Sequence, residues 1–370
     1  MGAHSQYVAL RSLLQKKREL KMVLRIGVVG AGIEGMSTAI NIQRQFIDAQ
    51  VTVIGADFSP RIRGKAGSTN CGAAFIMPEF LAGTPQELQK QWTKATHDHL
   101  VKIYYGPDAN RLGVNMASGY ALFTEIGEIS KGPPHWAETL FGWRKATPEE
   151  MSVFPEKFLD GWNFGTIVVN PGIYTEYLYD RFRLRGGKIV QRRLESMDEI
   201  ANDFDVFACS PGLGAFELLK DETMMPMRGQ LIAVSAPWVK FFYGYEKDDE
   251  TLCYIIPRVN DVILGGTFQV GEWDTTLDAD ITKRILDDCT EIVPSLKHAK
   301  IVDEWAGLRP GRPSVRLEYE HRELDSGKKI HVVYNYGHGG AGVTLHWGCG
   351  QMAAGFVKDA IEKNGLRSLL

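Results

Sequence analysis

The sequence predicts an α/β fold with two domains, and three observations carry this prediction. Residues 26–40 read as an apolar strand, a Gly30-x-Gly32-x-x-Gly35 turn and the start of a helix. A second apolar strand follows the helix and ends beside Asp57, about 20 residues after the glycines. The chain has 370 residues, which is more than one hydrophobic core usually serves. These features predict a Rossmann-like βαβ unit in the first domain.

The glycine spacing predicts a dinucleotide-binding turn. Gly30 permits the tight turn, Gly32 lets the backbone approach a pyrophosphate, and Gly35 lets the helix pack on the strand. The free N–H groups and the dipole of the helix then face an anion. A glycine-rich turn that merely precedes a helix is the alternative. The residues expected to contact the dinucleotide here are Gly30, Ala31, Gly32, Ile33, Glu34, Gly35 and Asp57.

Composition and charge exclude several classes of protein. A net charge of −3 and 44% hydrophobic residues argue against a nucleic-acid partner and against disorder. No apolar run reaches the roughly 18 residues of a membrane span, so no membrane partner is expected. The basic, acid-poor residues 1–21 lie before the first strand and are expected to form an N-terminal extension, either a transit peptide or a segment of another origin.

The five cysteines indicate buried thiols in a reducing compartment. Their number is odd, they are far apart and they form no Cys-x-x-Cys pair, so neither a disulfide framework nor a metal site is expected. They are Cys71, Cys209, Cys253, Cys289 and Cys349.

The remaining elements follow from periodicity. Helical spacing covers 85–103 and 280–292. Residues 205–214 read as a buried strand that ends in a glycine turn containing Ser210, and we expect this strand beside the first one. The tryptophan-, proline- and glycine-rich region 106–164 reads as loops with short elements that cap a pocket. Strand-like runs occupy 165–169, 188–191, 204–209, 231–234, 262–268 and 330–334.

The C-terminal third contains the most specific motifs. Gly307-Leu-Arg309-Pro-Gly-Arg312-Pro is followed by Asn335-Tyr-Gly-His-Gly-Gly-Ala-Gly-Val-Thr344. With these motifs and further matches spread over almost the whole chain from Val23, the sequence resembles the D-amino acid oxidase family. Among the further matches are 118–123, 140–145, 227–230, 236–238, 254–257 and 264–269.

The resemblance implies a Rossmann-like FAD-binding domain built from discontinuous segments and an α+β substrate domain with a large antiparallel sheet. The FAD-binding domain is expected to comprise 22–78, 165–220 and 300–370, and the substrate-binding domain 79–164 and 221–299. The implied chemistry is oxidative deamination of D-amino acids to 2-oxo acids, ammonia and hydrogen peroxide, with hydride transfer from Cα to flavin N5.

The catalytic residues expected from this resemblance are Arg309, Tyr254 and Gly340. An amino acid oriented for loss of its α-hydride needs a cation for its carboxylate and an acceptor for its amine. Arg309, between Gly307 and Pro310, offers a guanidinium fork on a stiff segment, and a surface salt bridge is its ordinary alternative. By resemblance, Tyr254 donates to the same carboxylate and the Gly340 carbonyl accepts from the amine.

His338 and Arg312, which lie near the catalytic residues in the sequence, are expected to have supporting roles. Hydride transfer from a neutral amine needs no base, so His338 is assigned to hydrogen bonding behind the site. Arg312 is interpreted as structural.

The resemblance also assigns FAD contacts outside the first glycine turn. Ser68 and Thr69 are expected near the phosphates, and Ala73, Ala74 and Phe75 against the ring. The turn at Gly339 opens a helix whose N–H groups would face the flavin pyrimidine edge. Three positions depart from the family pattern: its ribose acid aligns with Ala56 rather than Asp57, Met77 replaces a polar residue, and Ala341 replaces a tyrosine. The contacts expected in the last third are Ser210, Gly339, Gly340, Gly342, Val343 and Thr344.

Phe268 is the predicted specificity residue. The D-aspartate oxidase branch carries arginine here, and an apolar ring disfavours a buried substrate carboxylate. The lid-like stretch 243–250 is acidic and would also disfavour an anionic substrate. Neutral D-amino acids are therefore favoured. A D-aspartate oxidase is the alternative, with Lys247 or Arg258 as the cation. A nicotinamide-dependent dehydrogenase and a flavoprotein without turnover are further alternatives.

The expected partners are a small D-amino acid and molecular oxygen, with a homodimer left open. The family resemblance suggests a peroxisomal location, but Ser368-Leu-Leu370 lacks the basic middle residue of the usual address. A cytoplasmic location is the alternative.

Overall fold

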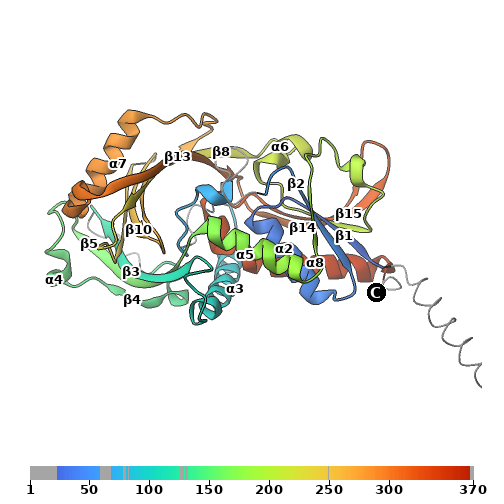
Figure 1. The fold of residues 1–370 in the computed structure, drawn as a ribbon, viewed down its shortest axis with the longest axis horizontal. Coiled ribbons are helices and arrows are strands. Elements are labelled where there is room, and N and C mark those ends of the chain that lie inside the picture. The colour runs from blue at the N-terminus through green and yellow to red at the C-terminus, as the bar shows by residue number, and fades with distance from the viewer. Residues whose placement is uncertain are drawn as a thin grey trace, which may run out of the picture.

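The computed structural model describes residues 23–366 except 59–67, 78–80, 82, 126–128, 130–131 and 249. Two β-sheets lie toward opposite ends of the long axis of the molecule, with helices between and around them (Figure 1). The predicted extension 1–21 and the C-terminal residues 368–370 lie outside the described residues.

The first sheet has six strands in the order β14-β15-β7-β1-β2-β6. All neighbouring strands from β15 to β6 run parallel, and β14 is antiparallel to β15. β7 lies beside β1, which confirms that the 205–214 segment joins the first strand. The strands are β1 (Arg25–Val29), β2 (Gln50–Gly55), β6 (Lys188–Gln191), β7 (Val206–Cys209), β14 (Arg316–Glu323) and β15 (Lys329–Tyr336).

Helices cover this sheet because its central strands are apolar on both faces. Four of the five residues of β1 and all four of β7 are buried. α2 and α8 pack closely, since a Cβ on Gly350 would lie 2.9–3.0 Å from the backbone of Ser37 and Thr38. The helices here are α2 (Ile33–Gln45), α5 (Pro171–Leu184), α6 (Ala215–Leu218) and α8 (Gly342–Lys363).

The second sheet has nine strands in the order β12-β8-β11-β10-β9-β3-β5-β4, with β13 also paired to β8. Its pairs are antiparallel except for β3 with β9, which confirms the expected large antiparallel sheet. The strands are β3 (Val114–Phe123), β4 (Phe141–Lys145), β5 (Asp160–Val169), β8 (Met225–Ser235), β9 (Phe242–Asp248), β10 (Thr251–Pro257), β11 (Val262–Thr267), β12 (Gln269–Val270) and β13 (Lys300–Gly311).

The other helices fall close to their predicted positions. α3 and α7 correspond to the helical spacing of 85–103 and 280–292, which confirms both predictions. These helices are α3 (Gln86–Tyr104), α4 (Pro148–Met151) and α7 (Ala279–Ile292). Short 3-10 helices are η1 (Ser68–Cys71), η3 (Ala137–Thr139), η4 (Met197–Ile200), η5 (Gly212–Gly214), η6 (Pro294–His298) and η7 (Gly339–Ala341).

Two interpretations of loops are wrong. The region 106–164 contains β3, β4 and the first half of β5, so it contributes long strands to the nine-stranded sheet as well as loops. The stretch 243–250 is mostly β9, which forms a hairpin with β10 instead of a lid. Asn115, Ser118 and Gly119 on β3 have low strand propensity, and pairing with neighbouring strands overrides it.

The strand membership also refines the expected domain segments. β13 belongs to the nine-stranded sheet, although 300–370 was assigned to the FAD-binding segments. Residues 165–169 likewise complete β5 of that sheet. The division into two domains otherwise stays a prediction.

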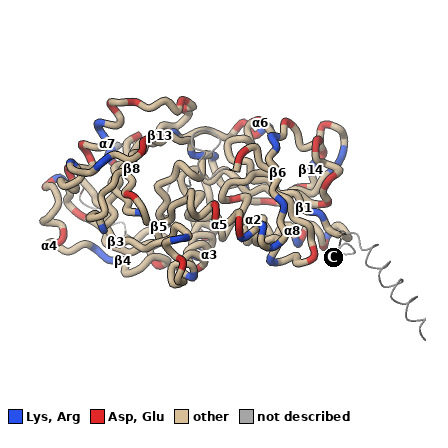
Figure 2. Tube along the Cα trace, viewed as in Figure 1, with Lys and Arg blue, Asp and Glu red and all other residues tan. Residues whose placement is uncertain are grey.

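The distribution of charged residues and cysteines agrees with the expectations from composition. Acidic and basic residues are interspersed along the chain around both sheets (Figure 2). All five cysteines are buried thiols outside any disulfide, which confirms their interpretation as core residues. Within the part of the chain that the structure describes, no helix is long and apolar enough to cross a membrane.

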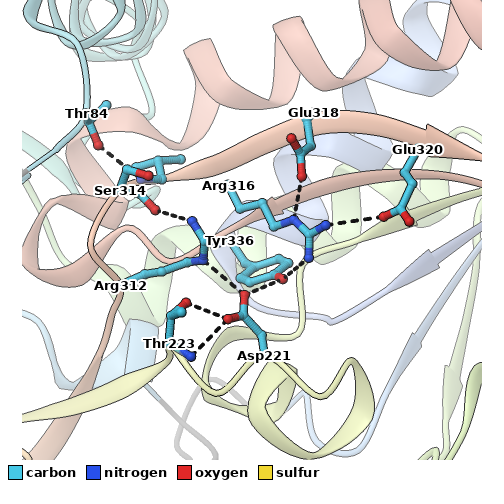
Figure 3. Close-up of polar contacts among 10 residues, drawn as sticks. Thr84, Asp221, Thr223, Arg312, Ser314, Arg316, Glu318, Glu320 and Tyr336 are labelled. Atoms are coloured by element: carbon cyan, nitrogen blue, oxygen red, sulfur yellow. Dashed lines mark hydrogen bonds and ion pairs between the residues drawn. The ribbon is translucent and has the colours of Figure 1, made fainter. Parts of the chain in front are cut away.

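A buried polar network holds the start of β14 and the end of β15 to the segment after α6 (Figure 3). Arg312 donates from Nε to Asp221 Oδ2 at 3.0 Å, and the Tyr336 hydroxyl donates to the same oxygen at 2.8 Å. Burial opposes ionisation of Asp221, but hydrogen bonds from Thr223, Tyr336 and Arg312 outweigh it and lower the Asp221 pKa to about 2. Arg312 is therefore structural, as predicted.

Candidate active site

One cavity of about 980 Å³ is lined by residues of both sheets. It extends from the glycine turn after β1 to Tyr254 and Arg309 on the nine-stranded sheet. Of the predicted site residues, only Gly35 does not line it. Those that do are Gly30, Ala31, Gly32, Ile33, Glu34, Asp57, Ser68, Thr69, Ala73, Ala74, Phe75, Ser210, Tyr254, Phe268, Arg309, Gly339, Gly340, Gly342, Val343 and Thr344.

The glycine turn is shaped by close backbone packing. Gly30 has a φ of +104°, and a Cβ there would collide with the Ser210 carbonyl. A Cβ on Gly35 would collide with the Gly30 carbonyl, so Gly35 lets α2 lie against the turn from behind the cavity. Gly32 offers α2 no side-chain cap, and the Ile33 N–H donates to Thr69 Oγ1 at 3.2 Å.

The polar groups at this end fit a dinucleotide. The first N–H groups of a helix have no partner within the helix and attract phosphate. The N-termini of α2 and α8 both reach the cavity, and neither has a side-chain cap. The buried Ser210 Oγ also has no hydrogen-bond partner among the described residues. These unsatisfied groups are what an anionic, polar cofactor would satisfy.

The start of α8 is joined to the small-residue segment around Phe75. The Met77 N–H donates to Thr344 Oγ1 at 3.2 Å. Phe75 in turn forms a bridge with Val168 on β5. Thr344 therefore holds the segment 73–77 in place between the two sheets, in addition to lining the cavity.

At the other end, two glycines on neighbouring strands lie between two large polar residues on the strands that flank them. The spatial order β13-β8-β11-β10 places Arg309, Gly229, Gly265 and Tyr254 on successive strands. A Cβ on Gly229 would lie 2.6 Å from Arg309 Nη1, and a Cβ on Gly265 would collide with the Tyr254 ring. The two large polar side chains thus lie over glycines on the adjacent strands.

Arg309 is a cation without a described acidic partner. Its Nη1 donates to the Thr267 carbonyl at 3.1 Å and more weakly to the Met227 carbonyl at 3.5 Å, and no ion pair with a carboxylate is found for it among the described residues. Burial raises the pKa of the neighbouring Tyr254, opposed by the charge of Arg309. Tyr254 therefore stays protonated at neutral pH and can donate a hydrogen bond.

The side-chain end of the cavity is aromatic. The Phe268 ring centroid lies 5.5 Å from Arg309 Cζ, and Trp273 also lines the wall. Lys247 lines the cavity but donates to both oxygens of Asp288 at 2.8 and 3.1 Å. Arg258 binds both oxygens of Asp261 at 2.7 Å.

Sequence reasoning missed the roles of Gly229 and Gly265. Both stand in motifs that carry the family resemblance, yet neither was singled out. The available signal is a glycine inside a strand, which often marks close approach of another group.

Comparison with known proteins identifies the class. Residues 25–355 match the family model described as FAD dependent oxidoreductase, DAO. The chain is 37% identical over 340 residues to the D-aspartate oxidase of Homo sapiens, covering 91% of this chain and 96% of that protein. It is 35% identical over 343 residues to the D-amino-acid oxidase of Rubrobacter xylanophilus, covering 92% and 98%.

Solved structures show the same fold at lower identity. Glycine oxidase from Bacillus cereus ATCC 14579 superposes with a TM-score of 0.70 at 17% identity, covering 93% of this chain and 98% of the other. Glycine oxidase from Geobacillus kaustophilus gives 0.69 at 18% identity, covering 92% and 95%.

The protein is thus an FAD-dependent oxidoreductase. It belongs to the DAO family, which confirms the resemblance noted from its motifs. This membership sets aside a nicotinamide-dependent dehydrogenase. The residues around the two uncapped helix N-termini fit FAD, and they would hold it along the cavity.

Proposed function

We propose that the protein catalyses oxidative deamination of neutral D-amino acids to 2-oxo acids and ammonia, with oxygen as acceptor and hydrogen peroxide as product. The observation that carries this proposal is the Arg309 guanidinium, which lines the cavity without a described carboxylate partner. A charged group in such a position is expected to bind an anionic ligand. The α-carboxylate of an amino acid matches its planar fork.

The residues around Arg309 complete the recognition of an amino acid. Tyr254, kept protonated by burial, donates to the same carboxylate. Gly340 lines the cavity just before α8, and its carbonyl accepts from the amine. FAD, when bound, supplies the acceptor for the α-hydride and passes the electrons to oxygen. The protein's part is to fix the substrate at three points so that one face of Cα is presented.

A neutral side chain is favoured because the other cations that the structure describes in the cavity wall are paired with carboxylates. Lys247 pairs with Asp288, Arg192 with Glu199, and Arg193 with Glu217. Arg258 pairs with Asp261. A second carboxylate on the substrate would meet the Phe268 ring and lose its hydration without a counter-charge.

D-aspartate is the second candidate substrate, since the human relative is a D-aspartate oxidase. The two relatives differ by only two percentage points of identity and do not discriminate. Acidic specificity would require Lys247 to leave Asp288 for the substrate.

The test compares D-alanine, D-methionine and D-aspartate, with L-enantiomers as controls. Anaerobic bleaching of the flavin absorbance reports reduction, and peroxide release in air reports turnover. We expect D-alanine and D-methionine to react faster than D-aspartate, and Phe268→Arg to raise the D-aspartate to D-alanine ratio of kcat/KM about tenfold or more. A wild-type preference for D-aspartate would overturn the neutral assignment, and oxidation of L-amino acids alone would overturn the function.

The proposed peroxide product also bears on location. Confinement with peroxide-degrading enzymes would limit damage, so we propose a peroxisomal location. Fluorescence microscopy of the full chain, tagged at its N-terminus, tests this against a cytoplasmic distribution.

A further inference from the structure

A carboxyl group is buried where the first turn of α2 meets the loop before α8. Glu34 follows Ile33 in that turn and is only 14% exposed. Neither of its carboxyl oxygens has a hydrogen-bond partner of normal geometry within the described ranges. A Cβ built on Gly342 would lie 3.4 Å from Oε1, so the carboxyl lies against the first residue of α8. An unsatisfied buried carboxyl is uncommon and calls for an explanation.

The imidazole of His338 lies close to this carboxyl. Its Nε2 lies 3.7 Å from Glu34 Oε2 and also has no hydrogen-bond partner in the described structure. His338 is 1% exposed. Since both atoms lack a partner and face each other, an approach of about 1 Å would form an O–H···N hydrogen bond that satisfies both.

The protonation states are compatible with such a bond. Burial raises the pKa of Glu34 well above its usual value, and the Asn335 amide opposes this only in part. Burial lowers the pKa of His338 to about 3, and His346 on α8 adds to the effect. Cys349, the other titratable group facing Glu34, is buried with a raised pKa. Burial therefore shifts both groups toward their neutral forms, in which a carboxyl O–H can donate to an imidazole nitrogen.

A neutral Glu34 is also what the neighbouring cofactor requires. A carboxylate in the first turn of α2 would repel the phosphates attracted to the same turn. A protonated carboxyl does not, and its proton needs an acceptor.

We propose that Glu34 is a positioning residue for FAD, whose carboxyl donates a hydrogen bond to His338 Nε2. This bond ties the first turn of α2, at the phosphate end, to the 337–342 loop that opens α8. Both helix N-termini are then held in one arrangement around the cofactor. The bond would add to the packing of α2 on α8 and to the hydrogen bond from Asn335 Nδ2 to Thr38 Oγ1.

The test measures cofactor binding and needs no substrate, so its outcome is independent of the substrate assignment. Glu34→Leu removes the donor with little change in volume and leaves the His338 nitrogen unpaired. We expect the FAD dissociation constant, from quenching of flavin fluorescence by apoprotein, to rise about tenfold. The absorbance maxima of the bound flavin should shift as well.

Glu34→Gln keeps a donor and should restore FAD affinity to within about threefold of wild type. Ser37→Ala is the matched control, because Ser37 is a buried, unpartnered hydroxyl on the same helix that does not line the cavity. It should leave FAD affinity unchanged. His338→Leu removes the acceptor instead, and it should weaken FAD binding as much as Glu34→Leu.

Two results would overturn the proposal. One is wild-type FAD affinity and spectrum in Glu34→Leu. The other is equal loss in the Gln and Leu variants, which would assign the effect to shape or charge instead of the hydrogen bond. If Glu34→Leu does not fold, His338→Leu and Glu34→Gln test the proposal. Wild-type FAD affinity in His338→Leu, or equal loss of affinity in both variants, would then overturn it.

Discussion

Gly229→Ala tests whether the position of the Arg309 guanidinium controls turnover. Gly229 lies on β8 directly opposite Gly307 on β13. A Cβ there would lie 2.6 Å from Nη1, 2.7 Å from Nη2 and 2.8 Å from Cζ of Arg309. Ordinary contact begins near 3.4 Å, so the guanidinium must retreat by somewhat less than 1 Å. It is the end of a flexible side chain, and the strands themselves need not move.

The expected loss follows from this displacement. A misplacement of about 1 Å in a substrate-orienting group can cost about 100-fold in rate. Complete removal of one partner of a buried charge pair costs about 3–5 kcal/mol, which sets the upper limit. We therefore expect kcat/KM for D-alanine to fall about 30- to 100-fold, while FAD affinity stays unchanged.

The assay is steady-state peroxide release, with flavin content measured on the same sample. Gly244→Ala is the matched control, since a Cβ at this cavity-lining glycine would meet nothing closer than 3.8 Å. It should change kcat/KM by no more than about threefold. The reasoning fails if Gly229→Ala keeps wild-type activity, or if both variants lose activity equally.

Three further predictions rest on other contacts. Arg309→Ala should retain FAD but lower kcat/KM by about 3–5 kcal/mol of transition-state binding, and wild-type kinetics would reject its role as carboxylate ligand. Gly30→Ala forces a side chain onto the Ser210 carbonyl at a positive φ, so the variant should purify largely as apoprotein, judged by the ratio of flavin to protein absorbance. Asp221→Asn should lower the free energy of unfolding by about 2 kcal/mol at pH 7, because the folded-state pKa of about 2 lies below the unfolded value of about 3.9. That contribution is present above about pH 4 and is lost as the pH falls toward 2, so urea unfolding at pH 7 and pH 3 should show a shrinking difference, and a constant difference would contradict the cause.

Local patterns predicted the elements that local interactions determine. α7 has a clear apolar face and a side-chain cap at Asp278, so its bounds fall within one residue of the predicted 280–292. β7 is apolar throughout and ends in a glycine turn, which is enough to place it in a buried parallel sheet. Motifs such as Gly30-x-Gly32-x-x-Gly35 predict their own backbone geometry, because only glycine fits the conformation and packing at Gly30 and Gly35.

The features that were missed depend on pairing between distant segments. β3 has an irregular burial pattern, although it pairs with β5 on one side and with β9 on the other. No period-two alternation survives in such a strand, so it resembled a loop. The Glu34 and His338 contact had no signal either, since the residues belong to separate motifs that only the packing of α2 on α8 brings together.

The glycines of the nine-stranded sheet explain how a large antiparallel sheet can present the polar side chains of Arg309 and Tyr254 to the cavity. A strand residue normally stands perpendicular to the sheet, where Arg309 and Tyr254 would each be separated from the other by two strands of side chains. With glycine at 229 and 265, the guanidinium and the phenol ring instead lie across the adjacent strands and approach one another. This arrangement leaves little freedom for either group, because each is supported by backbone rather than by a movable side chain. These long side chains therefore lose most of their conformational entropy when the protein folds. Less entropy is then lost when a substrate binds. Substrate affinity in this site should therefore respond more sharply to changes at the two glycines than to changes at the exposed end of the cavity.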